Sequence, residues 1–217
     1  MRVVQARVRR VLALIVLLAQ PSWVDAQDAA PPPAETAESR IETTAKVLAG
    51  AVLGLAVHEG GHLTFDLLLD APPGIKRISY AGIPFFAITH EPVSAPKEFT
   101  ISSAGFWAQH ASSELLLSRH PRLRYERAPF MKGMLAFNVL ASVMYAGAAL
   151  GRTGPDERDT RGMAVSARIA EPWVAPVILL PAVLDTIRYL RPESRAARWA
   201  SRAAKVGGVL LVLKTRS

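Results

Sequence analysis

The sequence predicts a mostly α-helical, multi-pass transmembrane bundle with about four membrane segments and a small β-hairpin after the first segment. Three observations favour this fold class. Half of the 217 residues are hydrophobic, and the mean hydropathy is positive, at +0.20. The apolar stretches are long enough to cross a bilayer core of about 30 Å as helices. The chain contains no cysteine, which excludes disulfide bonds and thiolate metal sites.

The N-terminal residues 1–26 have the pattern of a secretory signal peptide. The basic stretch RVRR precedes an apolar run, and Ala26 is a small residue suited to cleavage. Cleavage there would make Gln27 the first residue of the mature chain, and an uncleaved membrane anchor is the alternative. Residues 27–44 are rich in proline, alanine and acidic side chains, so we expect a flexible linker.

Residues 45–190 are expected to form the membrane core. Its four apolar segments are residues 47–69, 99–117, 130–150 and 163–190. The second segment is the least apolar, and the fourth carries three prolines, which kink or break helices. Between the first two segments, residues 75–91 alternate in polarity and are rich in Ile, Tyr and Phe, as in a β-hairpin.

The basic residues lie in short clusters between the apolar segments and give a formal net charge of +8. One such cluster is the loop at residues 119–132. The positive-inside rule for membrane proteins accounts for this pattern, so we expect no nucleic acid as a partner. The tail at residues 191–217 is also basic and ends in an apolar run that is too short to span a bilayer, which predicts an interfacial helix.

The stretch LAVHEGGHLTFDLLL places His58, Glu59 and His62 inside the first apolar segment, where polar groups are costly. Residues four apart share a helix face, so His58 and His62 can bind one metal ion while Glu59 activates water as a general base. Catalytic zinc sites use three protein ligands and keep the fourth position for water. The motif therefore predicts Zn²⁺-dependent hydrolysis. The alternative is two histidines satisfied by hydrogen bonds in a polar bundle interior.

A third zinc ligand is expected where the third segment ends and a further helix starts. Asp159 is the preferred candidate there, with Asp156 second. A carboxylate at such a place is also an ordinary helix N-terminal residue. Asp66, one turn beyond His62 on the same face, either orients a ligand histidine or reaches the membrane interface from the helix end.

Several small or amide residues indicate where helices pack. Gly50 and Gly54 precede His58 at four-residue spacing, which lets another helix approach closely. The small residues at 102–105 predict tight packing of the second segment against the motif helix. Asn138 in the third segment needs hydrogen-bond partners, either on another helix or on a substrate backbone.

Together these residues resemble the site-2 protease family of intramembrane zinc metalloproteases. The resemblance covers about residues 45–170. It rests on HEGGH in a membrane helix, on the hairpin that follows, and on FTISSAGFWAQ, which is similar to the family's small-residue segment. The element DTRGM stands where the family has an adjacent Asp-Gly pair. The chain departs from the family pattern here, because Asp159 is separated from Gly162 and no proline follows Asn138 closely.

The resemblance implies an intramembrane zinc endopeptidase, with Glu59 as the catalytic residue and His58, His62 and Asp159 as the zinc ligands. It further implies a membrane-associated protein or peptide as substrate and the lipid bilayer as environment, for which we expect the bacterial inner membrane. A non-catalytic membrane protein of the same fold, which binds a metal or a partner, is the alternative.

For Asp159 to reach the histidines, the first and third segments must run parallel. With an exported N-terminus, the basic loop at 119–132 then lies outside, against the positive-inside rule.

Overall fold

The computed structural model describes residues 39–80 and 83–214, so the expected signal peptide and most of the expected linker lie outside the described residues. The elements in chain order are α2 (Arg40–Leu68), β1 (Pro73–Tyr80), β2 (Ile83–His90), α3 (Ala95–Arg119), α4 (Pro129–Gly151), α5 (Asp159–Ala167), the 3₁₀ helix η1 (Glu171–Trp173), α6 (Val174–Leu190) and α7 (Arg195–Lys214). The mostly helical fold and the single small hairpin agree with the sequence prediction.

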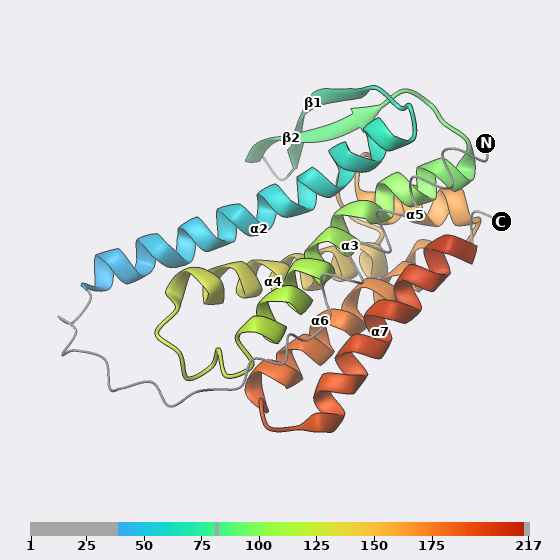
Figure 1. Ribbon diagram of the computed structural model, residues 1–217. Helices are drawn as coiled ribbons and strands as arrows, with labels where there is room; N and C mark the ends of the chain where they lie inside the picture. The colour runs from blue at the N-terminus through green and yellow to red at the C-terminus, as the bar shows by residue number, and fades with distance from the viewer. Residues whose placement is uncertain (1–38, 81–82, 215–217) are drawn as a thin grey trace.

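Helix α3 runs through the middle of the bundle, with α2 and α4 on one side and α6 and α7 on the other (Figure 1). It is antiparallel to α2, because His62 lies beside Ile101 and His58 lies beside Gln109. Helices α2 and α4 are parallel: Gly50 faces the start of α4, whereas His58 faces Tyr145 near its end. The parallel arrangement brings the end of α4, and with it the segment that carries Asp159, close to the two histidines of α2.

Among the described residues, three helical segments are long and apolar enough to cross a membrane, namely Arg40–Leu68, Pro129–Gly151 and Glu171–Leu190. Their outward faces are also apolar, as Val52, Leu140 and Leu180 show by their exposure. Both features suggest a membrane protein. The four predicted spans are not confirmed, because α3 is too polar to qualify.

The fourth predicted segment is broken, as its prolines led us to expect. Residues 163–190 comprise most of α5, the turn η1 and α6. Pro172 lies in η1, and Pro181 lies inside α6. A proline lacks the N–H that a helix interior needs, so a proline-rich apolar segment favours separate short elements over one continuous helix.

Helix α2 begins at Arg40, inside the segment 27–44 that the sequence assigned to a linker. The Ser39 side chain accepts a hydrogen bond from the Glu42 amide at 3.1 Å. Serine followed three residues later by glutamate is the pattern of a capping box, which satisfies amides at a helix start. Glu42 also pairs with Lys46 one turn on. Local capping therefore extends the helix beyond its apolar part.

Glycines allow α2 to contact both of its neighbours closely. A Cβ atom at Gly133 of α4 would collide with the backbone of Val47, and one at Gly54 would lie 2.7 Å from the Phe137 ring. On the α3 side, a Cβ atom at Gly61 would lie 2.7 Å from the Ala104 carbonyl oxygen. The close approach that the small residues predict is therefore present at both interfaces.

The predicted hairpin is present. Strands β1 and β2 pair antiparallel, with Ile75 opposite Ile88 and Arg77 opposite Phe86. Figure 1 shows the hairpin lying over the C-terminal part of α2, the part that carries the motif. Within residues 39–80 and 83–214, each strand pairs only with the other, so one edge of each strand has no strand partner there.

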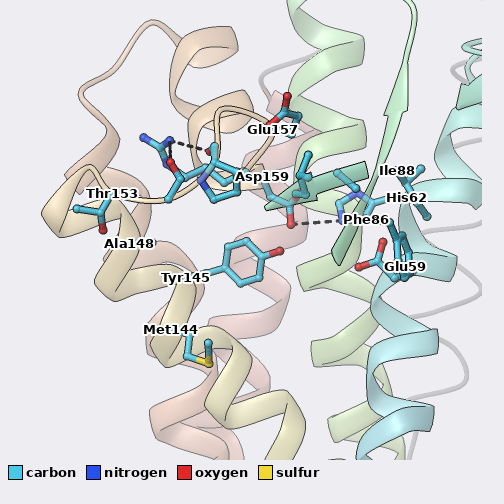
Figure 2. A pocket seen from close by; sticks show the side chains of 15 residues that line it. Glu59, His62, Phe86, Ile88, Met144, Tyr145, Ala148, Thr153, Glu157 and Asp159 are labelled. Carbon is cyan, nitrogen blue, oxygen red and sulfur yellow. Dashed lines mark hydrogen bonds and ion pairs between the residues drawn. The ribbon is translucent and has the colours of Figure 1, made fainter. Parts of the chain in front are cut away.

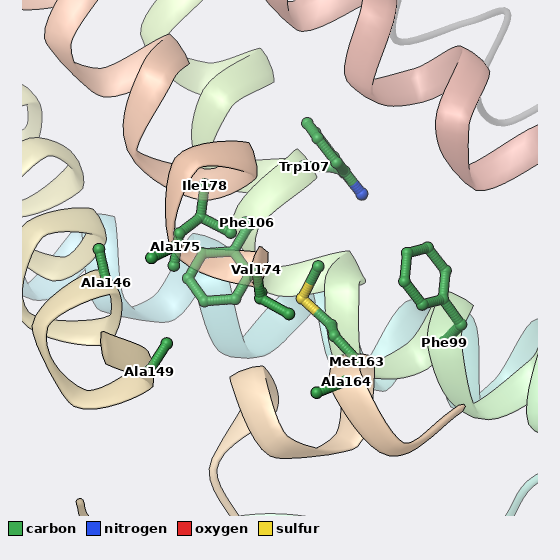
Figure 3. Close-up of a cluster of buried hydrophobic side chains, with 10 residues drawn as sticks. All are labelled: Phe99, Phe106, Trp107, Ala146, Ala149, Met163, Ala164, Val174, Ala175 and Ile178. Carbon is green, nitrogen blue, oxygen red and sulfur yellow. The ribbon is translucent and has the colours of Figure 1, made fainter. Parts of the chain in front are cut away.

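A cluster of buried apolar side chains joins α3, α4, α5 and α6 (Figure 3). Phe106 of α3 lies at its centre and is fully buried. Met163 and Ala164 bring the short helix α5 into the cluster. Because each buried apolar side chain contributes about 1.5–3 kcal/mol, this packing fixes α5, and with it Asp159, against the bundle. The residues drawn are Phe99, Phe106, Trp107, Ala146, Ala149, Met163, Ala164, Val174, Ala175 and Ile178.

Helix α7, expected at the membrane interface, packs along α3 and α6 through buried charges. Lys205 donates to Glu114 of α3 at 2.9 Å and to Asp185 of α6 at 2.7 Å. Glu114 also accepts from Arg188 at 2.7 Å and from Arg202 at 2.9 Å. Buried carboxylates require such partners, since an unpaired buried charge is strongly destabilising.

We expect Lys205→Met to destabilise the protein by about 3–5 kcal/mol, because it leaves two buried carboxylates each short of a partner. Thermal unfolding of the detergent-purified protein measures the effect. Arg195→Met is the matched control, since it removes an exposed cation from the same helix. Equal shifts in Tm for the two variants would contradict a stabilising role for the Lys205 contacts.

Candidate metal centre

Three potential ligand atoms converge between α2 and the start of α5. His58 and His62 lie one helical turn apart on α2, and Asp159 is the first residue of α5. The two imidazole Nε2 atoms are 3.3 Å apart. The Asp159 Oδ2 atom lies 3.1 Å from His58 Nε2 and 3.4 Å from His62 Nε2. These three residues form a group that could hold a metal ion.

The spacing of the three atoms suits a small tetrahedral ion. When a four-coordinate zinc ion binds N and O atoms at about 2.0–2.1 Å, those atoms lie about 3.3–3.4 Å from one another. The three distances of 3.1, 3.3 and 3.4 Å therefore form one face of such a tetrahedron. The site thus has the shape of a three-ligand metal centre with its fourth direction left to a non-protein group.

The hydrogen bonds of His62 fix which of its nitrogens is free. Its Nδ1 atom lies 2.9 Å from the Ile101 carbonyl oxygen. A carbonyl can only accept, so Nδ1 carries a hydrogen, and in the neutral imidazole Nε2 then presents a lone pair to the site. A backbone carbonyl that holds the rear nitrogen of a histidine is the usual support of a metal-binding imidazole.

His58 is oriented through a longer chain of contacts. Its Nδ1 atom lies 3.2 Å from Gln109 Oε1. The Gln109 amide nitrogen donates to the Asn138 carbonyl oxygen and to Ser142 Oγ at 2.7 Å, which fixes the orientation of the amide. His58 therefore also has a hydrogen on Nδ1 and a lone pair on Nε2, and both α3 and α4 hold it in this state.

The third group is an anion. Burial alone would raise the pKa of Asp159, but the adjacent imidazoles of His62 and His58 hold that pKa well below its usual value. This lowering requires positive charge beside the carboxylate, which a proton on an imidazole or a metal ion among the three groups supplies. The donor set, two imidazoles and one carboxylate, is one that Zn²⁺ accepts.

Gly105 keeps the space beside the ligands open. A Cβ atom at this position of α3 would lie 2.5 Å from His62 Nε2 and 2.6 Å from His58 Nε2. Aromatic rings enclose the other side of His58: Phe106 meets it edge-on with centroids 5.3 Å apart, and Tyr145 stacks on it at 5.7 Å. The segment at 102–105 that the sequence singled out therefore contains the residue that makes room for the site.

A pocket of about 420 Å³ opens onto the site from the hairpin side. Glu59 and Tyr145 lie on opposite walls, with His62 and Asp159 between them (Figure 2). The pocket is lined by Glu59, His62, Ile78, Phe86, Ala87, Ile88, Met144, Tyr145, Ala148, Thr153, Gly154, Pro155, Glu157, Arg158 and Asp159. Most of its lining is apolar, and its polar residues include Glu59, His62, Tyr145 and Asp159.

The other carboxylates that the sequence proposed as ligands lie elsewhere. Asp156 is exposed and pairs with Arg161. Asp66 is buried one turn beyond His62, and neither of its carboxylate oxygens has a hydrogen-bond partner among the described residues, but it is not part of the metal-binding group. Of the three candidates, the structure brings only Asp159 to the two histidines.

Two residues of the site were missed by the sequence analysis. Gln109 orients His58, and Tyr145 forms the pocket wall opposite Glu59. A signal for Tyr145 was present: Asn138, Ser142 and Tyr145 are spaced by four and three residues, so they form a polar stripe on one face of an apolar helix. Asn138 itself donates to Gln109 and Ser113 of α3, which makes it a contact between helices.

The part of the chain that the structure describes is mostly helical, with three helices apolar enough to cross a membrane and a largely buried His-His-Asp group that could hold a metal ion. Comparison of the sequence with protein-family models and with curated proteins, and of the structure with solved structures, finds no match. The activity must therefore be inferred from the site itself.

Proposed function

We propose that this protein is a membrane-embedded zinc endopeptidase, similar to site-2 proteases, that hydrolyses peptide bonds of membrane-associated proteins or peptides. The observation that carries the proposal is the placement of Glu59 in the same pocket as His62 and Asp159. A site that only stores a metal needs no general base beside it, whereas a hydrolase does. The bacterial inner membrane is the proposed location.

Each group at the site has a role in this reaction. His58, His62 and Asp159 would hold a zinc ion, which would supply Lewis-acid chemistry that lowers the pKa of water toward about 7. Glu59, half-buried at the pocket edge, accepts the proton of the attacking water and passes it to the departing amine. Tyr145 directs its hydroxyl into the pocket from the opposite wall and can donate to the carbonyl oxygen of the scissile bond as negative charge develops there (Figure 2).

The pocket walls favour an extended, apolar substrate. Ile78, Phe86 and Ile88 of the hairpin and Met144 of α4 contribute apolar surface. A free edge of the hairpin offers backbone hydrogen bonds to an extended peptide, which is how many proteins present a peptide by strand addition. A peptide segment that emerges from the bilayer can be both extended and apolar, as the pocket walls favour.

The test is metal-dependent cleavage by the detergent-purified protein. We expect about one zinc per chain by elemental analysis, cleavage of a membrane-anchored reporter, loss of cleavage with ortho-phenanthroline, and recovery on addition of zinc. His58→Ala should lose both metal and cleavage, whereas His120→Ala, which alters a loop histidine paired with Glu126, should keep both. Cleavage that survives complete removal of the metal would exclude the proposed mechanism.

The alternative is a non-catalytic membrane protein that binds a metal or a partner. The altered spacing between Asp159 and Gly162, relative to the family's adjacent Asp-Gly pair, favours it. In that case the protein binds zinc through the same three residues, but no reporter is cleaved and replacement of Glu59 has no effect in cells.

A further inference from the structure

Glu171, at the start of η1, binds the residues on both sides of Asp159. Its Oε1 atom accepts from Arg158 Nε at 2.7 Å and from Thr160 Oγ1 at 2.7 Å. Its Oε2 atom accepts from Arg158 Nη2 at 2.7 Å. One carboxylate therefore connects the residue before the ligand, the residue after it, and the start of the next helical element.

These contacts are shielded from solvent. The Arg158 and Glu171 side chains are only 9% and 10% exposed, and their two parallel bonds form a bidentate pair. Such charge-assisted pairs are short and fixed in geometry, unlike exposed surface salt bridges. Arg158 Nη1 also donates to the Pro155 carbonyl oxygen at 2.9 Å, so the same guanidinium holds the preceding loop.

Asp159 requires support of this kind more than the two histidines do. His58 and His62 lie within a 29-residue helix, whereas Asp159 opens a helix of nine residues directly after a loop. No side chain caps that helix start. A metal ligand at the end of a loop loses affinity if its carboxylate can rotate away, so its neighbours must be fixed.

We propose that Glu171 is a positioning residue for the metal site, which holds the Asp159 carboxylate toward His58 and His62 through Arg158 and Thr160. The inference rests on the metal-binding part of the proposed function and does not depend on peptide hydrolysis.

The experiment measures the Kd for zinc of the full-length, detergent-purified protein by chelator competition. Glu171→Gln should weaken zinc binding about 10–100-fold, the range found when supporting groups of metal ligands are removed. Glu193→Gln is the matched control: it also replaces a glutamate that pairs with an arginine, Arg122, but it does not line the pocket. Thr160→Val removes one contact of Glu171 without changing the charge. It should weaken zinc binding by a smaller factor than Glu171→Gln does.

A double-mutant cycle separates positioning from general destabilisation. In the Asp159→Asn background, Glu171→Gln should have no further effect on zinc affinity, because the group that it positions is already removed as a charged ligand. The absorption spectrum of the cobalt-substituted protein should also shift in Glu171→Gln and remain unchanged in Glu193→Gln.

Two results would overturn the positioning role: equal zinc affinities for the Glu171→Gln and Glu193→Gln variants, or the same loss of affinity in the Asp159→Asn background as in the wild type. Zinc binding that depends on Glu171, without any peptide cleavage, would refute the peptidase and leave the positioning role standing. A wild-type protein that binds no zinc would refute both.

Discussion

Replacement of Glu59 by glutamine is expected to abolish peptide hydrolysis while zinc stays bound. Glutamine has nearly the same shape as glutamate but cannot accept a proton from water. Glu59 is not among the three residues whose ligand atoms converge, so the metal-binding group remains complete. Removal of a general base lowers a rate by about 10²–10⁴-fold, so the loss should exceed that of any change outside the site.

The measurement compares the cleavage rate of a membrane-anchored reporter with the zinc content of the same preparation. Glu42→Gln provides the control, because Glu42 is an exposed glutamate in the first turn of the same helix. Retention of cleavage in the Glu59→Gln variant at normal zinc content would remove Glu59 from the mechanism. Loss of zinc together with cleavage would show instead that Glu59 supports the ligands.

Gly105→Ala is the second change with a large expected effect. The new Cβ atom would lie 2.5–2.6 Å from the Nε2 atoms of both His62 and His58, closer than such atoms can approach. The two imidazoles are held from behind by Ile101 and Gln109, so they cannot move aside without breaking those hydrogen bonds. We therefore expect zinc binding to fall by at least about 100-fold, in line with the largest losses seen when ligand support is removed.

Gly60→Ala tests whether this loss depends on position. Gly60 lies within the HEGGH motif itself, and a Cβ atom there meets no other group within 4 Å. Alanine is a better helix former than glycine by about 1 kcal/mol, so this variant should keep zinc and be slightly more stable. Both variants are assayed by zinc titration and by thermal unfolding. Normal zinc affinity in Gly105→Ala would show that α3 is able to shift away from the histidines.

The parts of the site that the sequence predicted are those that local spacing determines. His58 and His62 share a helix face because they are four residues apart, and no knowledge of the rest of the fold is needed to see it. Asp159 could be proposed as a ligand because it stands at a helix start after an apolar segment. The choice among Asp159, Asp156 and Asp66 required the packing of α5 against the bundle, which depends on residues far apart in the chain.

The contributions of Gln109, Tyr145 and Glu171 depend wholly on tertiary contacts. Gln109 reaches His58 across 51 positions of sequence, and a single glutamine in a helix does not indicate its partner. Tertiary contacts also limit how much of the fold the sequence can predict. The sequence predicted the helices and the hairpin, but α3 proved too polar to count as a membrane span. Three of its buried polar residues, Gln109, Ser113 and Glu114, bond to side chains of α4, α6 and α7, an arrangement that hydropathy along the chain does not reveal.

The separation of the metal-binding residues along the chain has a consequence for how the protein unfolds. His58 and Asp159 are 101 positions apart, and the hairpin, α3 and α4 lie between them. An ion held by both residues is a reversible crosslink that closes this long loop, and loop closure restricts the unfolded chain more than the folded one. For a metal ion bound there, the ion concentration would set the free energy needed to separate α5 from α2, and release of the ion would be coupled to opening of the stretch between them.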